Sequence, residues 1–272
     1  MEESRSWIAE MLALDRHGDV FIAAQAADGP GTRLFGGLIA AQALAAAGAT
    51  VEPAKRPHSF HLYFVRGGRY GLDVELHVER TRNGRAFDTR LVTAVQDHVV
   101  ILEMIASFHR PEPDADLHPV APRSLALAAS VPKFPDVHFA EHFEIRARPS
   151  DESLFALPPF WIRTRDKVDC HPLVRACVLT FMSDLGPAPA ARPAGAPPQA
   201  DGDFAASLDH SVWFHRDFDP HEWHRYDVHS LNNSDSRGLV AGAIYSQSGS
   251  LIASTTQETL WRIAGSSISP LP

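Results

Sequence analysis

The sequence predicts an α+β protein built from two similar halves, each a long buried helix wrapped by an antiparallel sheet. Two segments, starting near Gly36 and Pro172, are apolar nearly all round, which is typical of a buried helix. Each half also contains runs in which apolar and polar residues alternate, the pattern of a strand with one face on the core. Together these patterns favour two copies of one helix-and-sheet unit.

In the first half, residues 6–24 predict a short amphipathic segment and then a strand. The buried helix follows, because Gln42 is the only polar side chain between Gly36 and Gly48. At least four antiparallel strands come next, and Asn83-Gly84 is a strong signal for a two-residue hairpin between two of them. Their sequences are HSFHLYFVRGG, LDVELHVER, FDTRLVTAVQ and VVILEMIASF.

The second half begins after a Pro-, Ala- and Asp-rich stretch, so we expect an N-terminal unit at 1–110, a linker at 111–140 and a C-terminal unit at 141–272. FEIRA and FWIRTR predict strands, and Pro172 suits the first turn of the second buried helix. The stretch 186–199 predicts a mobile low-complexity loop. The remaining strands are HSVWFHR, EWHRYDVHS, GLVAGAIYSQSG and LIASTTQETLWRI.

Composition narrows the functional class. The chain has 272 residues, 44% of them hydrophobic, and a formal net charge of −8, which argues against nucleic acid as a partner. On a helix Cys170 and Cys177 would lie roughly 10 Å apart, too far for a disulfide, so we expect reduced thiols in a cytoplasmic protein. Neither a signal peptide nor a membrane-spanning run is recognisable. Four arginines fit a solvated strand face or, alternatively, an anionic cofactor: Arg80, Arg82, Arg85 and Arg90.

Two motifs support a duplication. HSFHLYF at His58 and HSVWFH at His210 are 210 − 58 = 152 residues apart. Gln96 and Gln247, in two further similar runs, are 247 − 96 = 151 apart. On these offsets Asp209 falls opposite proline and Gln257 opposite Ala106, so only the second half carries this acid and amide.

Asp209 and Gln257 are the candidate catalytic residues. Asp209 stands directly ahead of a strand pattern, where an acid is unusual, although a turn residue capping the strand would explain it as well. Gln257 lies in the strand-like run SLIASTTQETLWRI, where an apolar residue would ordinarily be expected. An acid that accepts a proton and an amide that holds a water form a hydrolytic pair if the fold brings them together. Backbone N–H groups at Gly36-Gly37, or at the helix near Pro172, are candidate donors to a carbonyl oxygen.

Other chemistries find less support. The chain has 15 histidines, yet its HxxH pairs lack the accompanying ligands of a zinc motif, so we expect no metal. His58 and His61 would point to opposite faces of their strand. No Gly-rich phosphate loop follows a strand and no G-x-S-x-G motif occurs, which argues against nucleotide hydrolysis and a serine nucleophile.

A buried helix wrapped by a long antiparallel sheet, present twice in one chain, is a tandem (double) hotdog. The runs RLFGG, HSFHLYFVRGG, RNGRAFDTR, FWIR, LDHSVWFHR and LIASTTQE resemble the acyl-CoA thioesterase II family over most of the chain. The resemblance implies hydrolysis of fatty acyl-CoA with no cofactor and no covalent intermediate. In that family an Asp, a Thr or Ser, and a Gln position one water, and Asp209 and Gln257 match the Asp and the Gln. The hydroxyl position aligns with Leu231, and Ser230 or Asn232 would serve if the turn is shifted by one residue.

The resemblance also implies an acyl-CoA-binding site, with Gly36, Gly37 and His58 as expected substrate contacts. A homodimer or higher homo-oligomer is expected. Two alternatives remain open. A non-catalytic acyl-CoA-binding protein would explain the leucine at position 231, and a hotdog hydratase is less favoured because its typical Asp/His pair is missing.

Overall fold

The computed structural model describes residues 6–27, 33–113, 116–117, 126–127, 142–147, 159–167, 171–192 and 204–262. The N-terminal half comprises α1 (Trp7–Met11), β1 (Leu14–His17), β2 (Val20–Ala23), α2 (Gly36–Gly48), β3 (Arg56–Phe64), β4 (Val74–Asn83), β5 (Phe87–Gln96) and β6 (Val99–His109). The C-terminal half comprises β7 (Phe143–Ala147), β8 (Phe160–Thr164), α3 (Pro172–Ser183), α4 (Pro187–Ala190), β9 (Phe204–Ser207), β10 (Asp209–Phe214), β11 (His224–Ser234), β12 (Arg237–Ser246) and β13 (Leu251–Arg262).

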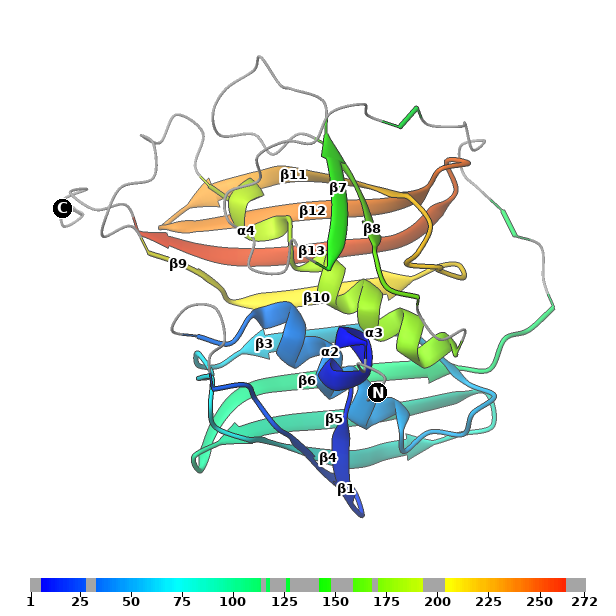
Figure 1. Ribbon diagram of the computed structural model, residues 1–272, viewed down its shortest axis with the longest axis vertical. Helices are drawn as coiled ribbons and strands as arrows, with labels where there is room; N and C mark the ends of the chain where they lie inside the picture. Colours follow the sequence, from blue (N-terminus) through cyan, green and yellow to red (C-terminus); the bar gives the residue numbers. More distant parts are fainter. Residues whose placement is uncertain are drawn as a thin grey trace, which may run out of the picture.

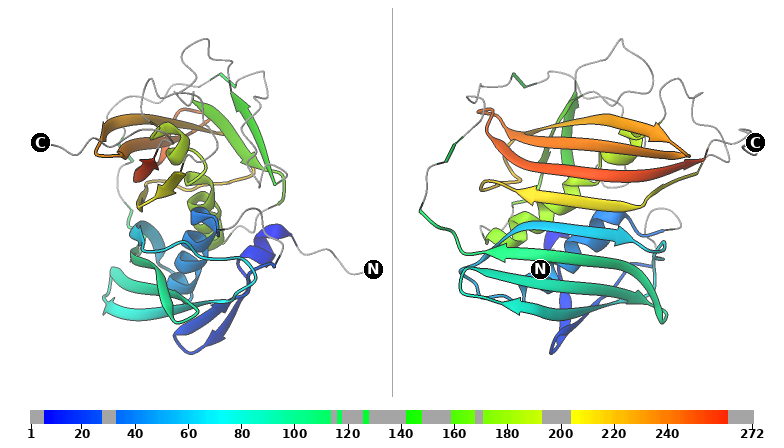
Figure 2. Two further views of the ribbon diagram at one scale, coloured as in Figure 1. Left: turned by 90° about the vertical axis from the view of Figure 1, so that its left-hand side faces the viewer. Right: turned by 180° about the vertical axis from the view of Figure 1, so that it is seen from behind.

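The described strands form one antiparallel sheet in the order β1-β2-β4-β5-β6-β3-β10-β13-β12-β11-β8-β7, with β9 beside β13 (Figure 1). The two halves join where β3 pairs with β10, from Ser59 opposite Trp213 to Tyr63 opposite Asp209. The sheet curves around α2 and α3, which lie on its inner face (Figure 2). The double hotdog that the sequence predicts is therefore confirmed.

The two long helices pack against each other in opposite directions. A Cβ atom on Gly37, in the first turn of α2, would lie 2.7 Å from the carbonyl oxygen of Phe181 near the end of α3. A Cβ atom on Gly48, the last residue of α2, would touch Leu173 at the start of α3. The first turn of each helix thus lies beside the last turn of the other.

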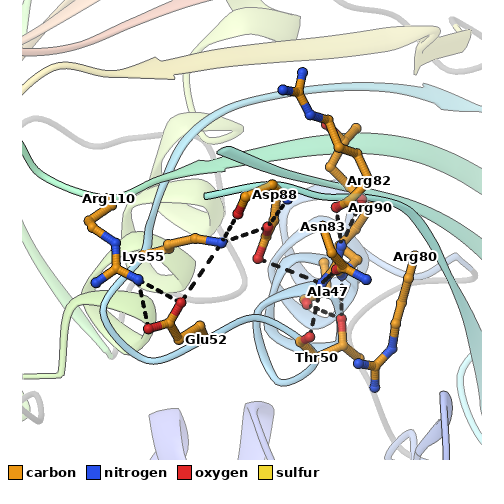
Figure 3. Close-up of polar contacts among 12 residues, drawn as sticks. Ala47, Thr50, Glu52, Lys55, Arg80, Arg82, Asn83, Asp88, Arg90 and Arg110 are labelled. Atoms are coloured by element: carbon orange, nitrogen blue, oxygen red, sulfur yellow. Dashed lines mark hydrogen bonds and ion pairs between the residues drawn. The ribbon is translucent and has the colours of Figure 1, made fainter. Parts of the chain in front are cut away.

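A buried polar network ties the C-terminal end of α2 to the β4–β5 hairpin (Figure 3). Arg90, only 1% exposed, donates to Thr50 Oγ1 at 2.7 Å and to Asn83 Oδ1 at 2.8 Å. Lys55 Nζ meets Asp88 Oδ1 at 2.7 Å, and both side chains are 4% exposed. Arg90 is therefore a structural residue, and neither of the two roles that the sequence left open for it applies.

Three further predictions, on the loop 186–199, the linker 111–140 and the two cysteines, fall partly outside the described residues. Pro187–Ala190 forms the short helix α4 inside the stretch where a mobile loop was expected, and residues 193–199 lie outside the described residues. Most of the expected linker, 111–140, also lies outside them. Cys177 is a buried free thiol, whereas Cys170 is not described. Within the described ranges, no helix has the length and apolar character needed to cross a membrane.

Cross-strand pairs fix the register of the repeat. Ser59 lies opposite Ser107 in the first half, and Ser211 lies opposite Thr256 in the second. Ser59 and Ser211 are 211 − 59 = 152 residues apart, the offset that the sequence gives. Ser107 therefore corresponds to Thr256.

This register changes one assignment. The residue after Thr256 is Gln257, so its counterpart is the residue after Ser107, which is Phe108. The sequence predicted Ala106 as the counterpart, which is wrong by two positions. That prediction matched the residues next to the turns, at Gln96 and Gln247, whereas strand pairing sets the register. The side chain that replaces the amide in the first half is a fully apolar one, 1% exposed.

Candidate active site

Gln257 lies near the middle of β13 with its side chain completely buried on the inner face of the sheet. Its Nε2 donates to Ser207 Oγ at 2.7 Å. Its Oε1 receives no hydrogen bond from the described residues. Ser207 ends β9, which pairs with β13, so the sheet itself holds the amide and the hydroxyl together.

Asp184 caps the C-terminal end of α3 and is 6% exposed. Burial raises the pKa of this carboxyl to about 7, against smaller opposing effects of hydrogen bonds from the Gln257 side chain and the Gly37 backbone N–H. Its Oδ1 has no donor among the described residues. A carboxyl with a pKa near neutral is well suited to accept a proton from water.

The N-terminus of α2 completes this corner of the molecule. A Cβ atom on Gly36 would lie 2.6 Å from Asp184 Oδ2, so a larger residue would displace the acid. Glycine is needed here for close approach, because its missing side chain lets the carboxylate reach the first turn of the helix. The free N–H groups and the dipole of that turn favour negative charge beside it.

His210, on β10, faces the same interior. Its Nε2 lies 2.8 Å from Ser183 Oγ, while the Ser183 hydroxyl donates to Thr180 O at 2.8 Å. His210 Nε2 and Ser183 Oγ thus share a hydrogen bond, and the tautomer of the ring decides which of the two atoms donates. Burial lowers the pKa of His210 to about 3, and the imidazole is neutral.

Three buried polar atoms without a hydrogen-bond partner among the described residues belong to this group of side chains. They are Asp184 Oδ1, His210 Nδ1 and Gln257 Oε1, and the Gln257 side chain interacts with both Asp184 and His210. Buried polar atoms are almost always hydrogen-bonded, so such a group requires a molecule that donates O–H or N–H. A water satisfies two acceptors at once, and beside an acid it is positioned to be deprotonated.

Asp209 lies at a bulge outside this cluster. β9 and β10 both pair with β13, but their registers differ by one residue, and Leu208 and Asp209 make up the irregularity. Asp209 is half-buried and pairs with Tyr63, a side chain 65% exposed on the outer face of the sheet. Its Oδ1 accepts from the Glu258 backbone N–H at 2.7 Å, and burial raises its pKa. The structure brings Asp209 to the backbone N–H of Glu258, the residue that follows Gln257.

Ser230 and Asn232 lie farther away, on β11. Ser230 pairs with Val240, which pairs with Gln257, so two strand spacings, roughly 10 Å, separate Ser230 from the amide. Both polar side chains are exposed and hydrogen-bond within their own strand. Leu231 is 54% exposed beside them. This strand does not supply a hydroxyl to Gln257, whereas Ser207 does.

His58 lies at the opposite end of β3 from the cluster, with Nε2 at 2.7 Å from Ser107 Oγ. It is the counterpart of His210 in the repeat. In the part of the chain that the structure describes, no three His, Cys, Asp or Glu side chains come close enough to hold a metal ion.

The sequence reasoning missed Asp184, Ser207 and His210. Ser207 and His210 lie within two residues of Asp209, the acid that the sequence predicted to be catalytic. The signal for Asp184 was a lone carboxylate directly after a helix that is apolar nearly all round. A charge in such a place is either solvated at the helix end or held in a site, and only the packing of α2 against it decides.

A buried acid, amide and hydroxyl at the N-terminus of a helix enclosed by antiparallel strands place this chain among the hotdog-fold proteins. A hotdog-fold protein of unknown function from Alicyclobacillus acidocaldarius superposes with a TM-score of 0.74 at 19% identity, covering 95% of this chain and 99% of that one. An acyl-CoA thioesterase II of Mycobacterium marinum superposes with a TM-score of 0.81 at 31% identity, covering 96% and 99%.

Sequence comparison gives the family. The model for "Acyl-CoA thioesterase" matches residues 142–260, and that for "Acyl-CoA thioesterase N-terminal domain" matches residues 24–109. Acyl-CoA thioesterase 2 of Haemophilus influenzae is 30% identical over 94% of this chain and 97% of its own length. Human acyl-coenzyme A thioesterase 8 is 34% identical over 86% of this chain and 82% of its own length. The chain belongs to the acyl-CoA thioesterase family.

Proposed function

We propose that this protein hydrolyses acyl-CoA thioesters, with Asp184 as the general base and Gln257 and Ser207 as the groups that hold the attacking water. The observation that carries the proposal is the buried contact of these three side chains beside the N-terminus of α2. The relatives named acyl-CoA thioesterases support the substrate class.

The water is held between Asp184 Oδ1 and Gln257 Oε1, the two acceptors without a donor from the described residues. As its oxygen attacks the thioester carbonyl carbon, one of its protons passes to the Asp184 carboxylate. The tetrahedral intermediate then expels the sulfur of CoA, which takes that proton and leaves as the thiol. A free fatty acid and CoA result, and the carboxylate is restored.

The first turn of α2 is suited to the negative charge that develops on the carbonyl oxygen. Gly37 already directs its N–H at Asp184, and the helix dipole adds positive potential at this point. Preorganised backbone donors of this kind are worth about 10²–10³ in turnover in other hydrolases. Of the two helix ends that the sequence offered, the Gly36-Gly37 end is next to Asp184, whereas Pro172 lies at the far end of α3.

Asp209 remains a second candidate for the base, and a pair of matched variants distinguishes the two acids. Asp184→Asn should lower turnover of a medium-chain acyl-CoA by a factor of about 10²–10⁴ with little change in binding of a substrate analogue. Asp209→Asn, the same change at the other acid, should lower turnover far less. Release of free thiol measures both. The reverse order of losses would make Asp209 the base and contradict the proposal.

Non-catalytic binding of acyl-CoA is less well supported than the sequence suggested. The argument for it was that Leu231 cannot hold a water, but the hydroxyl in contact with Gln257 is that of Ser207. The expected homodimer remains a prediction, which light scattering of the purified protein would test.

A further inference from the structure

A cavity of about 590 Å³ lies at the other end of α3 from Asp184. The start of β3, the end of β6, the end of β10 with the residues after it, and the first turns of α3 form its walls. Because α3 has 12 residues, roughly 18 Å of helix separates the cavity from Asp184. Its basic lining side chains are Arg56, His58, His109, Arg175, His215 and Arg216.

The cavity is the counterpart of the proposed active site in the duplicated fold. The N-terminus of α3 lies here as the N-terminus of α2 lies there, and His58 occupies the place of His210. The catalytic side chains are missing. The C-cap of α2 is Ala49 where that of α3 is an acid, and Phe108 stands where the second half has Gln257. The site has the position and space for a ligand but lacks both the acid and the amide of the proposed active site.

The charge pattern of the lining indicates an anion. Each arginine pairs with a carboxylate that is more exposed than the arginine itself. Arg56 is 45% exposed and lies 2.6 Å from Asp217, which is 81% exposed. Arg175 is 26% exposed and lies 3.2 Å from Asp219, at 42%, and Arg216 is 19% exposed and pairs with Asp116, at 65%. Ion pairs with such exposed carboxylates contribute about 0–1 kcal/mol, so a multiply charged ligand can displace them.

The histidines add to this pattern. The rings of His58 and His109 lie 6.2 Å apart, and burial together with the charge of His109 lowers the pKa of His58. Burial and the neighbouring Arg216 likewise lower the pKa of His215. Two carboxylates, Glu112 and Asp217, also line the cavity, and the lowered pKa values keep His58 and His215 neutral. The positive charge available to an anion is therefore that of the three arginines, with the neutral imidazoles as hydrogen-bonding groups beside them.

We propose that this cavity binds the phosphorylated nucleotide end of CoA without hydrolysing the thioester. Three arginines from three different elements match the several phosphate groups of such a ligand, since the guanidinium fork pairs with phosphate in a bidentate way. The volume lies in the range of small-molecule sites, larger than a single inorganic phosphate fills. CoA is chosen because of the proposed function, but the cavity and its charges are independent of it.

Calorimetric titration with CoA tests this on the intact protein. The wild type should bind one CoA more per chain than the double variant Arg56→Gln/Arg175→Gln, and adenosine 3′,5′-bisphosphate should compete for the lost site, whereas pantetheine should not. Acyl-CoA turnover of the variant should stay within about twofold of the wild type. Arg69→Gln is the matched control, because this arginine also pairs with an exposed aspartate, Asp97, outside the cavity. It should keep the full stoichiometry.

Equal stoichiometry and affinity in the wild type and the double variant would overturn the proposal. Loss of turnover together with CoA binding would also overturn it, since the cavity would then belong to the catalytic site. Competition by inorganic phosphate as strong as by the nucleotide would show a simple anion site instead. If the double variant is poorly folded, Arg56→Gln alone should weaken the second site at least about threefold. A wild type that fails to hydrolyse acyl-CoA would contradict the proposed function but leave this titration valid.

Discussion

Asp184 is predicted to lower the stability of the protein at neutral and alkaline pH, so replacing it with asparagine should stabilise the fold while it lowers turnover. Burial raises the pKa of this carboxyl from 3.8 to about 7. Each pKa unit corresponds to about 1.4 kcal/mol, so the ionised side chain costs up to about 4 kcal/mol. Asparagine keeps the shape and one acceptor oxygen but has no charge to bury.

The sign follows from proton binding. Between pH 3.8 and about 7 the folded state holds a proton at Asp184 that the unfolded state has lost, so stability falls as pH rises through this window. The cost is complete above pH 7 and absent when both states are protonated. Asp184→Asn should therefore be more stable than the wild type by up to about 4 kcal/mol at pH 8. At pH 5 this gain in stability should be smaller by about 2–3 kcal/mol.

Urea denaturation at pH 8 and pH 5 measures both values. In thermal melts, 1 kcal/mol corresponds to about 2–4 °C for chains of nearly this size. Asp209→Asn is the control, because a half-buried carboxyl has a smaller cost and should show a weaker dependence on pH. An Asp184→Asn variant that is destabilised equally at both pH values would refute the reasoning, since the carboxyl would then act through its hydrogen bonds and not its charge.

Three further changes probe the site and the fold. Gln257→Ala should reduce turnover by about 10²–10³, the usual effect of removing one positioned hydrogen-bonding group, and a thiol-release assay that finds full activity would exclude it from the site. Gly36→Ala would place a methyl group 2.6 Å from Asp184 Oδ2, and steady-state kinetics should show a loss in kcat larger than any change in KM. Asp88→Ala removes the buried carboxylate from Lys55 and leaves its ammonium only the Gly84 carbonyl and the more distant Glu52. Denaturation should show a loss of about 3–5 kcal/mol, whereas a loss below about 1 kcal/mol would show that water replaces the carboxylate.

Hydropathy patterns were sufficient to predict the two buried helices, the alternating strands and the duplication. These features depend on periodicity, because a helix that is apolar all round and strands that alternate have few other ways to bury their surface. The pairing register could not be read in this way. Turns of different length separate the last strands of the two halves, and the counterpart of Gln257 moved from Ala106 to Phe108 once the strand pairs were known.

The residues of the candidate site likewise fall into those that the sequence could predict and those that only the tertiary structure decides. Gln257 stood out in the sequence because a strand-like run carries an amide where an apolar residue would be expected. Gly36-Gly37 stood out because two glycines open a buried helix. The acid beside them could not be chosen from the sequence, since both Asp184 and Asp209 follow plausible element ends. Their environments are set by tertiary packing. The antiparallel packing of α2 on α3 buries Asp184 against the glycines, while a one-residue bulge turns Asp209 toward a backbone N–H on the outer face of the sheet. Local sequence determines which elements form, but which carboxylate loses its water depends on residues far away in the chain.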